Sequence, residues 1–154
     1  MNQMPLDELD RMILKELMVD ARQSFRDLAK KTQASVVTVS QRVKKMEKAG
    51  VIKGYSAQVS HESLGYEITT VTEVTVSKGR VLEVEKEIAK LPHVCAVYDV
   101  TGIEDSIVIA KFKNRSELSD FTKAVLVIPH VERTNTHVVL NTPKEDFRNP
   151  FLME

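Results

Sequence analysis

Apolar residues near the start of the chain recur mainly at intervals of three and four, the spacing of one face of an amphipathic helix. They are Leu6, Leu9, Ile13, Leu14 and Leu17. Asp7 and Asp10 stand at the N-cap and N3 positions of this helix, where carboxylates accept hydrogen bonds from unpaired backbone amides. The pattern therefore predicts a helix that begins directly after Asp7.

Two further helices are predicted between residues 24 and 50. Ser24 and Asp27 form a pattern similar to a capping box, and Ser35 is the expected N-cap of the helix that follows the turn at 32–34. Gly50 stands where a C′ residue ends that last helix. The positions expected to be buried are Phe25, Leu28, Ala29, Val39, Val43 and Met46.

Alternation of apolar and polar residues replaces the helical spacing after residue 67. The alternating runs lie near 68–76, 94–101, 106–112 and 131–140, with helical stretches at 81–89 and 116–126 between them. This order of strands and helices predicts a ferredoxin-like βαββαβ sandwich. We therefore expect an α+β protein with a helical domain at 1–60, a linker at 61–67 and the sandwich at 68–154.

A short internal repeat supports this order. Leu91-Pro92-His93-Val94 recurs as Ile128-Pro129-His130-Val131, and each copy follows a predicted helix and leads into a strand. The two histidines have no Cys or His at metal-ligand spacing, so we interpret them as turn residues and expect no metal site.

Two of the predicted strands are apolar on both faces. The first has Val94, Ala96, Tyr98 and Val100 on one face and Cys95 and Val97 on the other. The second has Ile107 and Ile109 on one face and Val108, Ala110 and Phe112 on the other. Because two helices cover only one face of a sheet, the second apolar face is expected to be covered by another copy of the chain in a homodimer.

Charge divides this chain of 154 residues into a basic and an acidic part. Basic and acidic residues balance at 22 each, yet residues 22–53 hold nine basic and two acidic side chains, a net charge of +7. Residues 1–60 hold 11 basic and 7 acidic residues, a net +4, whereas residues 61–154 hold 11 and 15, a net −4. A compact basic unit of this kind is the electrostatic footprint of a protein that binds a phosphate backbone.

The third predicted helix presents short polar and apolar residues in its first turns and lysines later. The order fits a helix whose first turns face base edges in the major groove, while later lysines contact phosphates. The DNA-binding residues expected here are Ser35, Val36, Val37, Thr38, Ser40, Gln41, Arg42, Lys44, Lys45 and Lys48. The alternative interpretation is a solvated, lysine-rich helix surface.

The stretches LDELDRMILKELMVDAR and DLAKKTQASVVTVSQRVKKMEKAGVIKGYSAQVSHESLGY resemble the DNA-binding half of the Lrp/AsnC (feast/famine) transcription regulators. The resemblance implies a winged helix-turn-helix domain that binds double-stranded DNA. It also implies dimers formed sheet to sheet and larger assemblies such as octamers. Two positions depart from the family pattern: Gln33 stands where Gly is frequent, and Val37 where a smaller residue is common. A positive φ at Gln33 would strain the backbone.

The turn at 101–106 contains residues suited to an amino-acid zwitterion. Gly102 permits close approach of a ligand carboxylate to backbone amides, Asp105 can pair with an α-ammonium, and Thr134 and Thr136 offer hydroxyls from one face of the last strand. An ordinary β-turn built from Gly and Asp explains the hairpin residues as well. The resemblance to the effector region of the family implies a site formed by Tyr98, Thr101, Gly102, Asp105, Thr134 and Thr136.

Other classes of protein fit the sequence less well. We find no nucleophile elbow, phosphate loop or metal cluster, so we expect neither an enzyme nor a cofactor. An architectural DNA-binding protein that responds to no effector remains an alternative. An RNA-binding protein fits less well, because the central strands have no aromatic residues apart from Tyr98 and Phe112. The lone Cys95, expected as a small buried residue, and the absence of a signal-like or membrane-spanning run favour a cytoplasmic protein.

Overall fold

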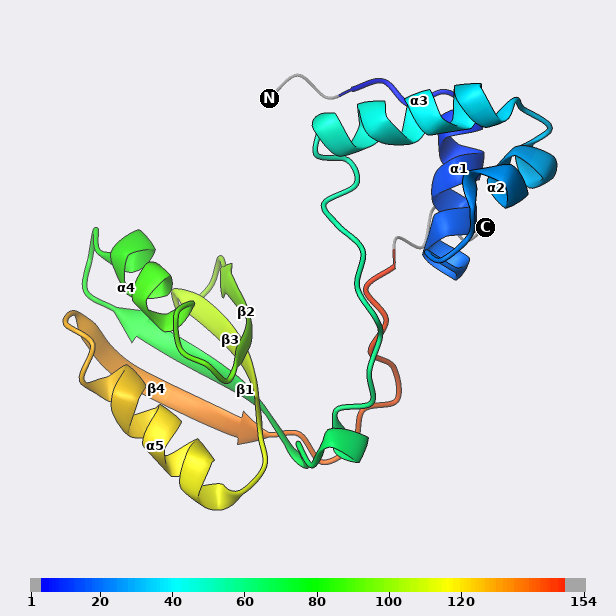
Figure 1. The fold of residues 1–154 in the computed structure, drawn as a ribbon. Helices are drawn as coiled ribbons and strands as arrows, with labels where there is room; N and C mark the ends of the chain where they lie inside the picture. Colours follow the sequence, from blue (N-terminus) through cyan, green and yellow to red (C-terminus); the bar gives the residue numbers. More distant parts are fainter. Residues whose placement is uncertain (1–3, 149–154) are drawn as a thin grey trace. The chain divides into compact units, whose positions relative to one another are not determined.

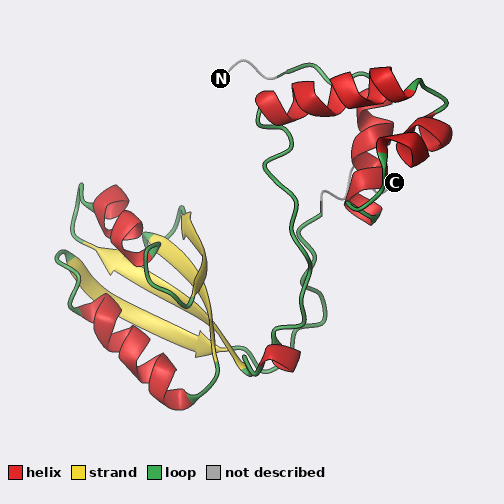
Figure 2. Ribbon diagram, in the orientation of Figure 1, coloured by secondary structure: helices red, strands yellow, loops and turns green. Residues whose placement is uncertain are grey.

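The computed structural model describes residues 4–148, which form two compact units (Figures 1 and 2). The first unit contains the chain up to Gln58 and also residues 145–148, and the second contains residues 59–144. Residues 145–148, assigned to the C-terminal domain from the sequence, thus cluster with the N-terminal helices. No helix in the described part of the chain is long and apolar enough to cross a membrane.

The first helix, α1 (Glu8–Val19), begins at a reciprocal capping box. The side chain of Asp7 accepts a hydrogen bond from the backbone N–H of Asp10 at 2.9 Å, and the side chain of Asp10 accepts one from the backbone N–H of Asp7 at 3.2 Å. The predicted start of the helix is therefore confirmed.

A helix-turn-helix follows, formed by α2 (Phe25–Thr32) and α3 (Val36–Lys48). Ser24 and Ser35 cap these helices as predicted, each accepting from a backbone amide three residues on. Gln33 in the turn has φ 55° and ψ 31°, the left-handed region in which a residue other than Gly costs roughly 1–2 kcal/mol. The strain expected from the departure at this position is thus present.

One apolar cluster holds the three helices together. It consists of Ile13, Leu14, Leu28, Ala29, Val39, Val43 and Met46. The prediction that Phe25 is buried is wrong, because its side chain is 39% exposed. Phe25 is the first residue of α2, and side chains of a helix lean toward its N-terminus, which carries this ring beyond the neighbouring helices.

The second unit contains a four-stranded sheet, two α-helices and a short 3-10 helix (Figure 1). Its elements are η1 (Glu62–Leu64), β1 (Ile68–Val76), α4 (Val81–Ile88), β2 (Val94–Asp99), β3 (Ser106–Phe112), α5 (Arg115–Leu126) and β4 (Val131–Val138). The strand order is β2-β3-β1-β4, and every neighbouring pair is antiparallel. This is the predicted ferredoxin-like sandwich.

Both helices cover the same face of the sheet. Val84 and Ile88 of α4 and Phe121 and Val125 of α5 are buried in one cluster with strand residues that include Val108. The opposite face, called the outer face below, is covered by no element in the described part of the chain. This arrangement confirms that the two helices cover only one face of the sheet.

A β-bulge changes which residues of β2 point to each face. The pairing shifts between Val94 and Ala96, so that Val94 and Val97 lie on the helix-covered face, while Ala96 and Tyr98 lie on the outer face. The simple alternation predicted for this strand is therefore wrong. Cys95 lies at the bulge and is exposed rather than buried, because the extra residue of a bulge is left out of the regular pairing.

Candidate DNA-binding and effector sites

One exposed stripe runs along the whole of α3. Val37, Gln41, Lys44 and Lys48 share this stripe, because they are three or four residues apart, and all four side chains are exposed. It lies opposite the buried positions of the helix, which include Val39. Ser40 and Lys45 lie on the borders of the stripe. The helix therefore presents first an apolar and an amide side chain and then ammonium groups.

The residues at the start of α3 have local partners. The hydroxyls of Ser35 and Thr38 are 2.8 Å apart, and the Ser35 hydroxyl also accepts from the backbone N–H of Thr38 at 3.0 Å. Val36 is exposed but lies beside the buried face. Ser35 thus serves first as a helix cap, and Thr38 retains a half-buried hydroxyl near the stripe.

Arg42, predicted to bind DNA, points toward α1 instead of along the stripe. Its Nη1 lies 2.5 Å from Oδ2 of Asp7 and 3.1 Å from both carboxylate oxygens of Asp10. These hydrogen bonds, with that to Asp7 foremost, raise the pKa of Arg42. Sequence reasoning missed this ion pair, although the two acids of the α1 capping box were its visible signal.

Two other basic residues of the segment 22–53 are also neutralised within the unit. Arg22 pairs with Asp20 at 3.0 Å, and Lys31 pairs with Glu16 at 2.6 Å. In each case the hydrogen bond to the cation is the main cause that lowers the pKa of the carboxyl group. The expected charge of +7 is therefore partly compensated on the side of α1.

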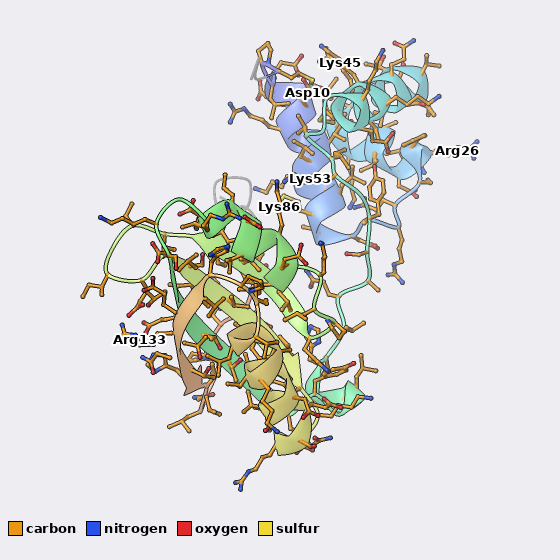
Figure 3. All side chains as sticks on the ribbon, turned by 90° about the vertical axis from the view of Figure 1, so that its left-hand side faces the viewer. Asp10, Arg26, Lys45, Lys53, Lys86 and Arg133 are labelled. Atoms are coloured by element: carbon orange, nitrogen blue, oxygen red, sulfur yellow. The ribbon has the colours of Figure 1, made fainter. Side chains whose placement is uncertain are left out.

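The remaining basic side chains keep their charge available. Within residues 4–148, no ion pair joins any of these groups to an acid: Arg26, Lys30, Lys44, Lys45, Lys48 and Lys53. Figure 3 shows Arg26 and Lys45 at the outer surface of the unit. A positive surface formed by α3 and the exposed side of α2 is what a phosphate backbone requires.

A hydrogen bond from Tyr55 joins the chain that follows α3 to the last turns of that helix. The hydroxyl of Tyr55 donates to Oε1 of Glu47 at 2.9 Å, and partial burial of the phenol together with this carboxylate raises the pKa of Tyr55 to about 12. The contact joins the extended chain after Gly54 to the last turns of the helix. It was not anticipated from the sequence.

The hairpin between β2 and β3 is hydrogen-bonded to the end of β1. The backbone N–H of Asp105 donates to the carbonyl of Val74 at 3.0 Å, and Oδ2 of Asp105 accepts from the backbone N–H of Val76 at 2.8 Å. Glu104 accepts from the Thr75 hydroxyl and pairs with Arg133 of β4 at 2.7 Å. Sequence reasoning identified Asp105 but missed Glu104 and Arg133.

The tip of this hairpin is open. Thr101, Gly102 and Ile103 are exposed, and within the described chain their backbone N–H groups donate to no backbone carbonyl. Oδ1 of Asp105 likewise has no hydrogen-bond partner among the described residues. The tip therefore offers amide donors beside one carboxylate oxygen.

Tyr98 and the two threonines predicted for the effector site lie on opposite faces of the sheet. Thr134 and Thr136 lie on the helix-covered face of β4, opposite Val74 and Thr72, and the hydroxyls of Thr136 and Thr72 are 3.1 Å apart. Tyr98 lies on the outer face, paired with Ile107 on the other side of the sheet. A ligand that contacts both groups must therefore be held by more than one copy of the chain.

A helix-turn-helix with a positive exposed face, followed by a ferredoxin-like sandwich, defines a two-domain DNA-binding transcription regulator. Residues 6–53 match the winged helix-turn-helix DNA-binding family, and residues 69–148 match the Lrp/AsnC ligand binding domain. The chain belongs to the Lrp/AsnC family of transcriptional regulators, which are not enzymes. The resemblance drawn from the sequence is therefore confirmed.

Relatives and solved structures agree with this membership. An uncharacterized HTH-type transcriptional regulator of Pyrococcus abyssi is 48% identical over 143 residues, 93% of this chain and 97% of the relative. The regulator FL11 of Pyrococcus horikoshii is 38% identical over 146 residues, 95% of this chain and 97% of its own.

Two solved structures share the whole architecture. E. coli AsnC has a TM-score of 0.86 at 28% identity and covers 93% of this chain and 97% of its own. The regulator NMB0573 of Neisseria meningitidis was solved as a complex with L-Met and has a TM-score of 0.86 at 25% identity. It covers 96% of this chain and 97% of its own.

Proposed function

We propose that the chain binds specific DNA sequences through α3 and that an amino acid modulates this binding. The observation that carries the proposal is the exposed stripe of α3. Val37 and Gln41 come first, where an apolar group can meet a thymine methyl and an amide can pair with adenine. Lys44 and Lys48 follow, free of ion pairs with described residues, where ammonium groups can neutralise phosphates.

The hairpin tip and β4 support an amino acid as the effector. A zwitterion needs donors for its carboxylate and an acceptor for its ammonium group. The open amides at Thr101–Ile103 supply the donors, and Oδ1 of Asp105 supplies the acceptor. The L-Met bound to the Neisseria relative is a ligand of this class. Because Tyr98 lies on the outer face and Thr134 and Thr136 lie on the helix-covered face, the proposed site is shared between copies in an assembly larger than a dimer, such as an octamer.

DNA binding is tested by selecting a duplex from a random pool and comparing it with its scrambled form in gel shifts. Repeating the titration with each amino acid then tests the effector. A regulator of this kind prefers the selected duplex and changes its affinity with one or a few amino acids. Equal binding of both duplexes, unaffected by every amino acid, would establish an architectural protein instead.

The effector site is tested by calorimetry on two variants of one residue. Asp105→Asn keeps an oxygen that can accept from the Val76 amide but loses the charge that pairs with an ammonium, whereas Asp105→Ala loses both. We expect heat from the effector to be abolished in both variants, while the melting temperature falls only in Asp105→Ala. Unchanged binding to Asp105→Asn would move the ammonium site elsewhere.

A further inference from the structure

The turn between α2 and α3 contains a backbone conformation that its residue type does not favour. Gln33 has φ 55° and ψ 31°, and in the part of the chain that the structure describes only His130 is another non-glycine residue with positive φ. The backbone N–H of Gln33 donates to the carbonyl of Ala29, which ends α2. Gly adopts such angles without steric cost and carries the same N–H. The turn therefore needs the backbone of Gln33 but not its side chain.

The side chain of Gln33 has no partner among the described residues. It is exposed, and its amide makes no hydrogen bond to any residue between 4 and 148. Gln23 provides the contrast, because its Nε2 donates to the carbonyls of Glu16 and Asp20 and so joins α1 to the chain before α2. Backbone strain that no internal contact of the side chain offsets is typical of a residue that binds a ligand.

Gln33 lies where two parts of the positive surface meet. Lys30, in the last turn of α2, precedes it by three residues, and Val37, at the start of the α3 stripe, follows it by four. In a helix-turn-helix bound to DNA, the second helix lies in the major groove and the first crosses the sugar–phosphate backbone. The turn that joins the two helices therefore passes the edge of the groove, where phosphate groups lie within reach of an exposed side chain.

We propose that the side-chain amide of Gln33 donates a hydrogen bond to a phosphate of the DNA backbone. The proposal rests on DNA binding through α3 and adds a contact from outside that helix. Gln is among the side chains that bind phosphate oxygens, and an uncharged donor neutralises no phosphate. Gln33 thus contributes affinity without sequence preference and without salt dependence. These properties separate it from Lys44, which contributes salt dependence, and from Gln41, which contributes sequence preference.

Two substitutions test the contact in gel shifts on a selected duplex and on its scrambled form. Gln33→Met keeps the length of the side chain but loses the amide, and Gln33→Gly also removes the backbone strain. We expect both variants to lose affinity by about 3- to 10-fold, the size of one ordinary hydrogen bond. The loss should be equal for both duplexes, at an unchanged slope of log affinity against log salt. The melting temperature of Gln33→Gly should be no lower than that of the natural chain, which separates the loss from a folding defect.

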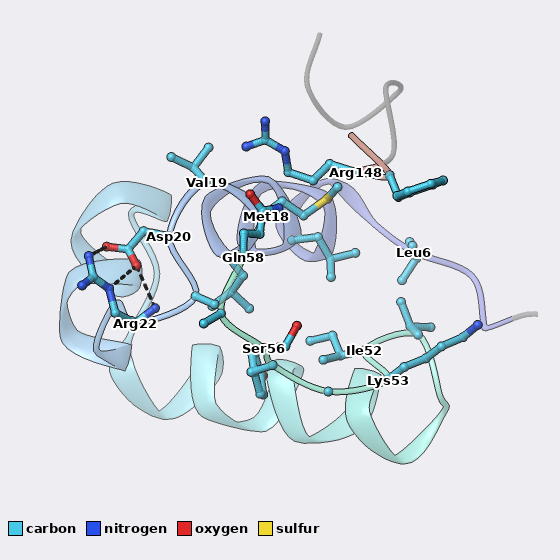
Figure 4. A pocket seen from close by; sticks show the side chains of 18 residues that line it. Leu6, Met18, Val19, Asp20, Arg22, Ile52, Lys53, Ser56, Gln58 and Arg148 are labelled. Carbon is cyan, nitrogen blue, oxygen red and sulfur yellow. Dashed lines mark hydrogen bonds and ion pairs between the residues drawn. The ribbon is translucent and has the colours of Figure 1, made fainter. Parts of the chain in front are cut away.

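Matched changes elsewhere in the chain serve as controls. His130→Gly removes the same kind of backbone strain from the sandwich. Gln58→Met removes an exposed amide from the pocket between α1 and residues 51–58, which Gln58 lines together with Met18 (Figure 4). Both control variants should bind the two duplexes as the natural chain does.

A methylphosphonate, which replaces one charged phosphate oxygen by a methyl group, locates the contact when it is placed at each phosphate in turn. One position that weakens the natural chain should have no effect on either Gln33 variant, while the other positions keep theirs. Unchanged affinity of both Gln33 variants would overturn the proposal, as would equal losses in the control variants. A loss confined to the selected duplex would indicate a base contact instead. A natural chain that binds neither duplex would overturn DNA binding itself together with this contact.

Discussion

Nη1 of Arg42 lies 3.1 Å from each carboxylate oxygen of Asp10, a side chain of which only 1% is exposed. Asp10 belongs to the capping box of α1, and Arg42 lies in the middle of α3. One buried carboxylate therefore both starts the first helix and fixes the helix that presents Gln41 and Lys44. The contact ties the orientation of the DNA-binding stripe to the N-terminus of α1.

Replacing Asp10 by Ala should destabilise the first unit. The change removes the buried acceptor of hydrogen bonds from the Arg42 guanidinium and from the N-cap amide, while Arg42 keeps its contact with Asp7. A hydrogen bond to a charged group contributes about 1.5–3 kcal/mol. Urea denaturation followed by circular dichroism measures the free energy of unfolding. Glu8→Ala is the matched control, because Glu8 is an acidic residue in the same first turn of α1 and its side chain is exposed. Equal losses in both variants would mean that only the charge at the helix start matters.

Acid should destabilise the first unit through Asp7. The backbone N–H of Asp10 and then the Arg42 guanidinium hold the pKa of Asp7 below its ordinary value of 3.8. A carboxyl whose pKa is lowered by folding stabilises the folded state above its unfolded pKa, and this contribution is lost as the pH falls through the folded pKa. Glu16, Asp20 and Asp27 have lowered pKa values in the same unit and act in the same direction.

The variant Asp7→Asn isolates this effect, because an amide oxygen can still cap α1 but does not titrate. Urea midpoints measured from pH about 5 to about 2 should fall less steeply for Asp7→Asn than for the natural chain. Parallel curves would show that the ion pair between Asp7 and Arg42 adds no stability in solution.

Removing lysines from α3 should weaken binding to all DNA sequences alike. Each lost phosphate contact lowers the slope of log affinity against log salt by about 1, so Lys44→Ala with Lys45→Ala should lower it by about 2. Gln41→Ala should leave the slope unchanged and alter the preference among sequences. Lys15→Ala on α1 is the control for charge alone. If random duplexes bind the double variant as well as the natural chain, the proposed groove-facing orientation is wrong.

The helices and the order of strands follow from the sequence because their signals are local. Ser24, Ser35 and Gly50 mark helix ends through hydrogen bonds and backbone angles that span only a few residues. The faces of β2 could not be predicted in the same way. The bulge at Cys95 depends on how β2 pairs with β3, which no pattern within β2 encodes.

The candidate sites were predictable in part for the same reason. The stripe through Val37 and Lys44 follows from helical spacing alone. Residue type alone made Arg42 an equally good DNA contact, and only the tertiary approach of α1 assigns it to Asp7 and Asp10. Asp105 was identified as a polar residue of a turn, but its hydrogen bond to Val76 depends on the approach of two segments far apart in the sequence.

The outer face of the sheet should form a dimer interface. Val71, Ile107 and Ile109 lie on this face, with Ala96 and Tyr98 beside them, and no described element covers it. Interfaces of permanent dimers are largely apolar, so a charge at the centre of this face should prevent association.

Ile109→Asp is expected to sediment as a monomer at micromolar concentration, whereas the natural chain sediments as a dimer or larger. Leu82→Asp, at a side chain 67% exposed on the helix-covered side, should leave association intact. A natural chain that is monomeric, or an Ile109→Asp variant that still dimerises, would show that another surface or no surface joins the copies.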